Sequence, residues 1–396
     1  MSGYRVAFHR KIAALLFCVV LLGFVVFSGA GTDPGVRAEE KPSISDHYDG
    51  RLFFNPDQRP GPSAGSEQKR RSGWIWRWIF GNDRPEWPEL IDRVPPGGAP
   101  PVRVPKGSLL ITPVGHATFL IQMDRLNLLT DPIWSERCSP VSWAGPKRYR
   151  EPGIRFEDLP PIDAVLVSHN HYDHLDLPTL ERLAGKGARR CLTTLGNRDL
   201  IRGAGIPDAE EFDWWQQVRL SDEVTVTVVP AQHFSSRSLW DRNETLWGGF
   251  VISGPSGNLF FAGDTGYGPH LREIARRFSP IRAALLPIAP FRPPEPAEQP
   301  RSTFLQVHMG PAEAVQAHLD LQAGVSIAAH FQVFQLGWDA FDDAPRGLRN
   351  ALVERGLPPD AFIAPLPGRF VALEPSGAAA GSANLLQPGR QSVGMR

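Results

Sequence analysis

Short runs of apolar and β-branched residues, bounded by turn-forming residues, recur from about residue 105 onward. The first stretch, SLLITPVGHATFLIQMDRLNLLTDP (108–132), predicts strands joined by a turn near Met123 to Leu126. Further strands are predicted at 163–168, 223–231, 248–253, 258–264, 283–290 and 325–331, and helices at 176–185, 269–278 and 310–321. This mixture of strands and helices, with no repeat of fixed period, predicts an α/β fold with mixed sheets.

The first 38 residues have the pattern of a segment that directs export. Arg5, Arg10 and Lys11 precede an apolar run from Ile12 to Ala30. That run approaches the ~20 residues that span a bilayer, which favours an uncleaved anchor, whereas residues 36–38 offer a signal-peptidase site. Both alternatives, a signal peptide or an N-terminal membrane anchor over residues 1–38, place the rest of the chain on the periplasmic or extracellular side.

Composition divides the remainder of the chain into three parts. Residues 39–104 are rich in proline, glycine and charge, and we expect a loosely packed arm there. Within this arm a short aromatic segment either packs onto the domain as a strap or enters a lipid interface; it contains Trp74, Trp76, Trp78 and Phe80. Residues 105–374 form the predicted compact domain, and residues 375–396 are so rich in small side chains that we expect a disordered tail.

Charge and cysteine content narrow the function mainly by exclusion. Lys plus Arg and Asp plus Glu number 42 each, so the overall charge gives no support for nucleic acid as a partner. The 39 prolines and 11 tryptophans argue against an all-helical protein. Besides Cys18 in the apolar run, the chain has Cys138 and Cys191, which form either one disulfide in an oxidising compartment or two separate buried thiols.

Histidines and aspartates gather where the predicted strands end. VLVSHNHYDHLDLPTL (165–180) places four metal-ligating side chains directly after one strand, and one more follows each of three later strands: His169, His171, Asp173, His174, His233, Asp264 and His330. Strand ends are rigid positions from which loops can turn side chains toward a shared centre. Imidazole and carboxylate groups suit zinc, and seven donors exceed the four that one tetrahedral ion takes, which predicts two metal ions.

Further motifs occur beside this cluster and carry a resemblance to a known family. In chain order they are VGHATFLIQ (114–122), LTDPIWSERCSPVSWAGPKRYR (129–150), QHFSSRSLWDRNETLWGGFVI (232–252), FAGDTGYGP (261–269) and LLPIAPF (285–291). Over residues 105 to 370, the chain resembles the metallo-β-lactamase-fold hydrolases, and within them the N-acylphosphatidylethanolamine-hydrolysing phospholipases D. The resemblance implies a metallo-β-lactamase αββα sandwich of two mixed β-sheets flanked by helices.

The resemblance also implies a role for each site residue. One zinc ion would be held by His169, His171 and His233, and a second by Asp173, His174 and His330, with Asp264 bridging the two and serving in catalysis. His308 would contact substrate or the leaving group, although a lone histidine before a helix can equally be a capping or surface residue. His116 would orient the Thr130–Pro132 loop, which includes Asp131, through hydrogen bonds, so that both support the ligands without binding metal.

The implied activity is that of a binuclear zinc-dependent phosphodiesterase of the phospholipase D type. A hydroxide held by two Zn²⁺ ions would attack N-acylphosphatidylethanolamine-like phospholipids to give phosphatidic acid and N-acylethanolamine. The partners would be the phospholipid and a membrane surface, with monomer and homodimer both open, and the segment 292–306 would border the substrate groove.

Two other functions compete with this interpretation. One is a lactonase or phosphoesterase of the same fold that acts on a small soluble substrate. The other is a non-catalytic tethered protein with structural zinc. The seven donors argue against the latter, because structural zinc sites are closed four-ligand sites.

Overall fold

The structure is a computed structural model that describes residues 43–58, 84–88, 98–238, 240–293, 305–373 and 384–385. The expected export segment (1–38), the aromatic residues between 74 and 80, and most of the 292–306 segment and of the C-terminal tail lie outside the described residues. Among the described residues, no helix has the length and apolar character needed to cross a membrane.

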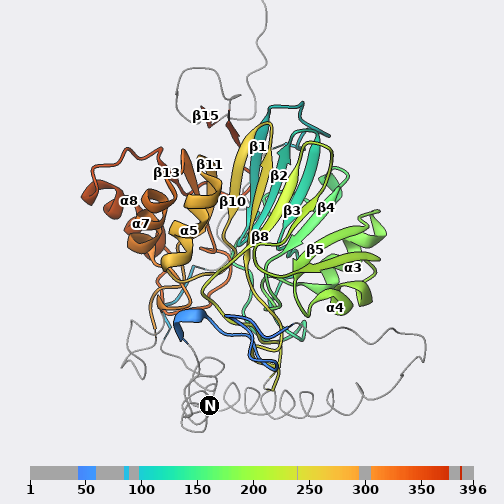
Figure 1. Ribbon diagram of the computed structural model, residues 1–396. Coiled ribbons are helices and arrows are strands. Elements are labelled where there is room, and N and C mark those ends of the chain that lie inside the picture. The colour runs from blue at the N-terminus through green and yellow to red at the C-terminus, as the bar shows by residue number, and fades with distance from the viewer. Residues whose placement is uncertain are drawn as a thin grey trace, which may run out of the picture. The chain divides into compact units, whose positions relative to one another are not determined.

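Two mixed β-sheets form the centre of the fold (Figure 1). The first contains β1 (Leu109–Gly115), β2 (Thr118–Met123), β3 (Leu126–Thr130), β4 (Ala164–Val167), β5 (Arg190–Thr194), β6 (Asp208–Phe212), β14 (Val371–Leu373) and β15 (Asn384–Leu385). The second contains β7 (Gln217–Arg219), β8 (Thr225–Val229), β9 (Gly249–Gly254), β10 (Gly257–Phe261), β11 (Ile281–Pro287), β12 (Val325–Ala329) and β13 (Phe362–Ile363). Their strand orders are β15-β14-β1-β2-β3-β4-β5-β6 and β13-β12-β11-β10-β9-β8-β7.

Each sheet combines an antiparallel part with a parallel part. In the first sheet, β1, β2 and β3 pair antiparallel, and the pairs from β3 to β6 are parallel. In the second, β7 to β10 pair antiparallel, and β10 to β13 pair parallel. The predicted turn between β2 and β3 is confirmed, since Asp124 and Arg125 adopt positive φ angles of 47° and 68° at that position.

Helices cover the outer face of each sheet (Figure 1). Helices α3 (Leu177–Gly185) and α4 (Arg198–Gly203) cover the first sheet; α5 (Pro269–Phe278), α7 (Pro311–Leu321) and α8 (Asp343–Glu354) cover the second. Short 3₁₀ helices occur at η1 (Pro56–Gln58) and η2 (Phe156–Asp158). A proline in the first turn of α3, α5 and α7 suits the helix start, where its missing N–H leaves no bond unmade.

The alternation of side chains along the strands creates the layers. On β2, Phe119 and Ile121 join the core between the sheets together with Phe261 of β10. The intervening Leu120 points to the opposite face and joins Leu180 of α3. Because successive strand residues face opposite sides, a strand that is apolar throughout is buried on both faces. The predicted αββα sandwich is confirmed.

The N-terminal arm differs from its expected loose packing. Tyr48 and Phe53 are 6% and 3% exposed and belong to the core between the sheets. Their rings pack against each other with centroids 4.6 Å apart. The compact unit therefore extends back to Ile44 rather than starting at residue 105. The composition of residues 39–104 did not reveal this packing, because two buried aromatic side chains are enough to dock a short segment that is otherwise polar.

Two smaller expectations are settled by the structure. Cys138 and Cys191 are free, buried thiols, so the disulfide alternative is wrong for this structure. Residues 384–385 of the expected disordered tail form β15, antiparallel to Val371 and Ala372. This pairing makes β15 the edge strand and satisfies main-chain groups of β14 that would otherwise lie at the sheet edge.

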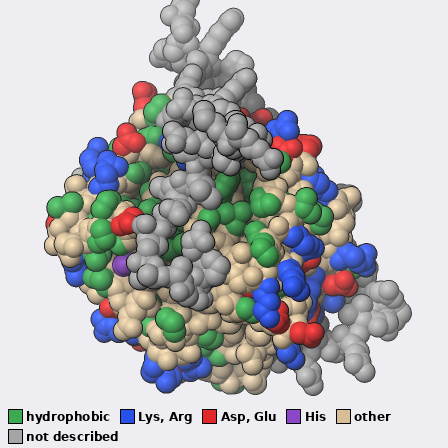
Figure 2. Space-filling model, turned by 90° about the horizontal axis from the view of Figure 1, so that it is seen from above, with side chains coloured by type: hydrophobic (Ala, Val, Ile, Leu, Met, Phe, Trp, Pro, Cys, Tyr) green, Lys and Arg blue, Asp and Glu red, His purple; other side chains and the backbone are tan. Residues whose placement is uncertain are grey.

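Charges of both signs are interspersed on the face shown in Figure 2. Ion pairs on the protein surface include Arg103 with Asp163, and Lys106 with Glu223. Among its described residues, that face lacks a broad field of one sign.

Candidate metal centre

The seven predicted ligands lie close together, each after the C-terminal end of a strand. The loop after β4 carries four of them, and His233, Asp264 and His330 follow β8, β10 and β12. The loop is tightened by bonds from the main-chain N–H groups of His174 and Leu175 to the His171 carbonyl. The first sheet thus supplies four donors and the second sheet three, and they meet where strand ends of the two sheets adjoin.

Three imidazoles form the first donor cluster. Nδ1 of His171 lies 2.8 Å from Nε2 of His169 and 3.1 Å from Nε2 of His233. Zinc binds imidazole nitrogen at about 2.0–2.1 Å, which puts two ligands of one tetrahedral ion roughly 3.3 Å apart. The three nitrogens all lie within 4.8 Å of one another, close enough together to bind one small cation.

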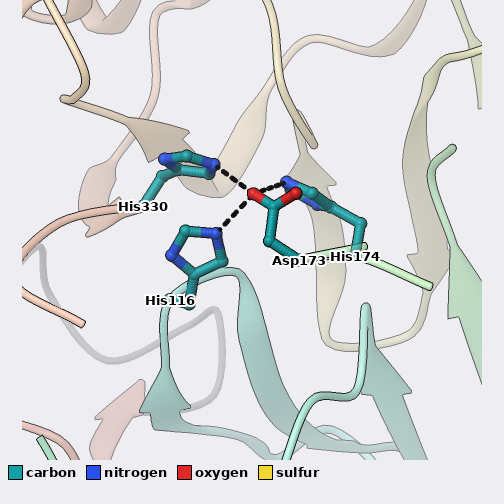
Figure 3. Close-up of side chains that lie close together, drawn as sticks. All are labelled: His116, Asp173, His174 and His330. Carbon is teal, nitrogen blue, oxygen red and sulfur yellow. Dashed lines mark hydrogen bonds and ion pairs between the residues drawn. The ribbon is translucent and has the colours of Figure 1, made fainter. Parts of the chain in front are cut away.

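The second cluster surrounds the carboxylate of Asp173 (Figure 3). Its Oδ2 lies 3.2 Å from Nε2 of His174, 3.2 Å from Nε2 of His330 and 2.9 Å from Nε2 of His116. All four side chains are buried. They converge from three separate chain segments on one oxygen atom, so this second group is also compact enough for one cation.

Asp264 lies between the two clusters. Its Oδ2 is 3.7 Å from Nε2 of His233 in the first cluster, and 3.3 Å and 3.2 Å from Nε2 of His174 and His330 in the second. Its other oxygen, Oδ1, is buried and makes no hydrogen bond within the described part of the chain. A buried carboxylate oxygen without a partner is costly, so a bound cation would satisfy it.

The first cluster offers neutral ligands. Burial lowers the pKa of His169 well below its ordinary value and lowers the pKa values of His171 and His233 to about 3. These imidazoles are uncharged at neutral pH and present lone pairs. Zinc requires that form of histidine.

The second cluster has the opposite balance. Burial alone would lower the pKa of His330, but the nearby Asp264 and Asp173 outweigh it and raise that pKa to about 9. The pKa of His174 is raised for the same reason. The pKa values of both aspartates lie well below the ordinary value despite burial, because these imidazolium groups face them. The protonated imidazoles balance the negative charge of the two aspartates, and a bound cation could replace those protons.

Asp131 organises ligands of both clusters, as its predicted supporting position requires. Its Oδ2 accepts a bond from Nδ1 of His174 at 2.7 Å and one from the Ser168 hydroxyl at 2.6 Å. That hydroxyl oxygen lies 2.9 Å from Nδ1 of His169, which therefore donates to it. The Ser168 N–H donates to Asp131 Oδ1 at 2.7 Å. Both histidines are thereby fixed with Nε2 free to face the centre.

His116 does not orient the 130–132 loop as predicted, because its ring donates toward Asp173 instead. The loop is held by neighbouring groups: Thr130 Oγ1 donates to the Ala117 carbonyl and Thr118 Oγ1 to the Asp131 carbonyl. A hydroxyl on β2 reaches the loop directly, whereas the His116 ring lies against Asp173. Its carbonyl accepts the His330 N–H at 2.9 Å.

His308 lies beside the centre rather than on the surface. Its Nδ1 is 3.9 Å from Asp264 Oδ2, and its ring centroid is 5.0 Å from that of His233. Burial lowers its pKa to about 3, so the ring is neutral. The structure thus brings the predicted substrate-contacting histidine within reach of the centre.

Several contacts around the centre were not predicted. Asn55 bonds the main chain of His233, the Val307 carbonyl accepts from His233 Nδ1 at 2.8 Å, and Arg237 Nη1 donates to the carbonyls of Asn170 and Leu175 at 2.7 and 2.8 Å. Arg237 stood within the stretch that carried the resemblance. Asn55 lies in the arm that we expected to be loosely packed, so no contact with the centre was predicted for it.

Comparison with known proteins places this centre in a family. A family model described as a beta-lactamase superfamily domain matches residues 126–331, which include all seven clustered ligands. The chain belongs to the beta-lactamase superfamily. Among solved structures, this superfamily member is similar to an isothiocyanate hydrolase from Delia radicum gut bacteria, with a TM-score of 0.54 and 20% identity, covering 67% of this chain and 99% of that one. That likeness supports the fold.

Relatives of this beta-lactamase superfamily member include named phospholipases. N-acyl-phosphatidylethanolamine-hydrolyzing phospholipase D 1 of Caenorhabditis elegans is 32% identical over 259 residues, 63% of this chain and 71% of that protein. The mitochondrial enzyme of the same name from Saccharomyces cerevisiae is 35% identical over 238 residues, 58% and 49% of the two chains. The resemblance found in the motifs is confirmed, and the chain is a metallo-hydrolase with a histidine- and aspartate-rich candidate metal site.

Proposed function

We propose that the protein is a binuclear zinc phosphodiesterase of the phospholipase D type, which hydrolyses N-acylphosphatidylethanolamine-like phospholipids to phosphatidic acid and N-acylethanolamine. The observation that carries the proposal is the position of Asp264 Oδ2, within 3.7 Å of one donor cluster and 3.3 Å of the other. A carboxylate placed between two donor clusters can bind an ion in each, which suits a two-metal site. The phospholipase relatives supply the substrate class.

The residues present fit zinc. The donor set consists of five imidazoles and two carboxylates, the ligand types that zinc prefers, and Asp264 Oδ1 is a buried oxygen without a hydrogen bond in the described chain. His169, His171 and His233 would hold one ion; Asp173, His174 and His330 would hold the other; Asp264 would join them. When bound, a pair of zinc ions lowers the pKa of water for in-line attack on phosphorus and offsets charge on the phosphoryl oxygens.

The chain's own residues prepare the site for this chemistry. Asp131 and Ser168 fix the ring orientations of His169 and His174, and the Val307 carbonyl fixes that of His233. His308 is neutral and borders Asp264, so its N–H can donate to a phosphoryl oxygen or to the departing ethanolamine oxygen. No side-chain nucleophile is needed, since water attacks.

The proposed setting is a membrane surface outside the cytoplasm. The substrate is a bilayer lipid, and the N-terminal residues have the pattern of a signal or an anchor. The electroneutral composition is compatible with a lipid partner and offers nothing for nucleic acid.

Metal analysis combined with a hydrolysis assay tests the proposal. The purified full chain, prepared with zinc, is assayed with N-acylphosphatidylethanolamine vesicles beside a panel of lactones and soluble phosphodiesters. We expect about two zinc ions per chain and release of N-acylethanolamine together with phosphatidic acid. A preparation that binds zinc but releases only ring-opened acids from lactones would overturn the phospholipase assignment. As a control, an Asp124→Asn variant is altered in a buried aspartate that bonds Ser256 and Gly107 and is not a predicted ligand. We expect it to bind zinc and to release the same products as the wild-type chain.

A further inference from the structure

We propose that the N-terminal segment 44–55 is a clamp for the metal centre, in which Asn55 is the positioning residue for His233. This inference rests on the proposed role of His233 as a metal ligand. It assigns a function to a segment that precedes the matched family domain by more than seventy residues.

His233 needs an outside partner because it lies beyond its strand. Strand β8 ends at Val229, and Pro230 follows it. Asn55 Nδ2 donates to the His233 carbonyl at 2.9 Å, and the His233 N–H donates to Asn55 Oδ1 at 3.2 Å. One side-chain amide thus binds both main-chain groups of one residue, as a neighbouring strand would.

The amide of Asn55 is itself held in place. Asn55 is 5% exposed, and its Oδ1 also accepts a bond from Trp247 Nε1 at 3.1 Å. The same indole N–H lies 3.0 Å from the Ala231 carbonyl. Trp247 is 1% exposed, so it forms a rigid support behind the amide. The oxygen and the nitrogen of the Asn55 amide therefore have fixed directions, with the oxygen toward two donors and the nitrogen toward a carbonyl.

The rest of the segment is anchored independently of the centre. Nε2 of His47 lies 2.7 Å from Asp213 Oδ1, and its ring stacks on Trp214 with centroids 4.2 Å apart. The Phe53 N–H donates to the Asn243 carbonyl at 2.9 Å. These contacts anchor the chain just before Asn55 and involve no predicted metal ligand, so the clamp position is set by the fold rather than by metal.

The consequence is that His233 is fixed from two sides. The amide of Asn55 sets its main chain, and the Val307 carbonyl sets the ring through Nδ1. Only Nε2 remains to face His171 and Asp264. Groups that orient a ligand in this way typically change metal affinity about 10–100-fold when removed.

The test measures zinc affinity of the full chain by competition with a chelator. Asn55→Ala removes both bonds to His233, and Asn55→Ser keeps a shorter hydroxyl that cannot make both. The control is Asn258→Ala, which removes a comparable side-chain amide bond, the one to the Phe278 carbonyl. Asn258 lies at the start of β10, whereas Asp264 follows the end of that strand, so this bond is remote from the predicted ligands. We expect zinc binding about 10–100-fold weaker in Asn55→Ala, a smaller loss in Asn55→Ser and no loss in Asn258→Ala.

Cobalt substitution provides a readout of ligand geometry. If Asn55 positions His233, the visible spectrum of the cobalt-loaded protein shifts in Asn55→Ala and Asn55→Ser but not in Asn258→Ala. Wild-type affinity and an unchanged spectrum in folded Asn55→Ala would overturn the clamp. If Asn55→Ala does not fold, the same result in Asn55→Ser would overturn it. Failure of the wild-type chain to bind zinc would instead overturn the proposed function, so the two failures are distinct.

Discussion

The Oδ2 atom of Asp131 lies 2.7 Å from Nδ1 of His174, and both side chains are fully buried. Burial raises the pKa of Asp131, while His174 and Ser168 oppose that rise. Asp131 also accepts a bond from the Ser168 hydroxyl, which in turn accepts one from His169. It therefore orients one ligand in each cluster.

Replacing Asp131 with Asn removes this shared acceptor. The amide has one oxygen where the carboxylate has two, and its NH₂ group would face the Ser168 N–H or the His174 N–H. We expect zinc affinity about 10–100-fold weaker, measured by chelator competition, with a parallel loss of phospholipid hydrolysis. Asp124→Asn, which weakens a buried turn that bonds Ser256, should lower the melting temperature yet keep the zinc. Equal zinc affinity in Asp131→Asn and wild type would contradict the assigned role.

Asp264→Asn should separate the two metal positions. The neutral amide removes one charge from a carboxylate that approaches His233, His174 and His330. We expect metal content to fall toward one ion per chain, and turnover of N-acylphosphatidylethanolamine to fall by more than about 100-fold. Elemental analysis of the dialysed protein and product release measure the two effects. Turnover that survives the substitution would show that Asp264 has no part in catalysis.

Zinc binding should release protons from one half of the centre only. His171 and His233 have pKa values lowered to about 3, so at neutral pH they bind zinc without losing a proton. The pKa of His330 is raised to about 9, so below that pH a proton must leave before the ring can ligate. Affinity of the second ion should therefore rise as the pH increases toward 9.

Titration calorimetry in buffers of different ionisation enthalpy measures this proton release. The first equivalent of zinc should release few protons, and the second should release more. Equal release by both equivalents would argue against the electrostatic difference between the clusters.

The docking of residues 44–58 should weaken at alkaline pH. Burial lowers the pKa of His47, but its bonds with Asp213 and Asp46 outweigh that effect and raise it. The stability that His47 contributes, of order 1 kcal/mol, is present in full below the unfolded value of 6.5 and is lost as the pH rises through the raised folded pKa. Asp46 is largely exposed, so Asp213 carries most of the effect.

Hydrogen exchange of the 44–58 peptide region tests the pH effect. After correction for intrinsic rates, its protection should be lower at about pH 9 than at about pH 6. The difference should disappear in His47→Gln. His318→Gln is the control, since His318 bonds Ser326 away from this segment. Protection in wild type that does not change with pH would contradict the prediction.

Most of the fold was predictable because the apolar runs are short and regular. Runs such as that around Phe119 alternate between two buried faces, and the four ligand-bearing strands could be read from aliphatic residues just before the histidines. Ligand positions followed because a strand end fixes where the next side chains begin. The seven ligand residues could thus be predicted from their order along the chain relative to the strands.

The supporting contacts were not predictable, because they depend on distances between remote segments. Asn55 meets His233 across 178 positions, and no local pattern marks such a pair. His116 was given the wrong partner because its ring meets Asp173, 57 positions further along the chain, and no local pattern marks that contact. Likewise, nothing in the sequence distinguished two buried thiols from a disulfide at Cys138 and Cys191.

The division of donors between the two sheets has a mechanical consequence. The His330 N–H, at the end of β12 in one sheet, donates at 2.9 Å to the carbonyl of His116, at the end of β1 in the other. Sliding one sheet past the other by even an ångström would separate donors whose spacing is about three ångströms. A bound metal would then cross-link the two sheets, and sliding of one sheet past the other would be resisted most strongly at the edge that carries the candidate metal site.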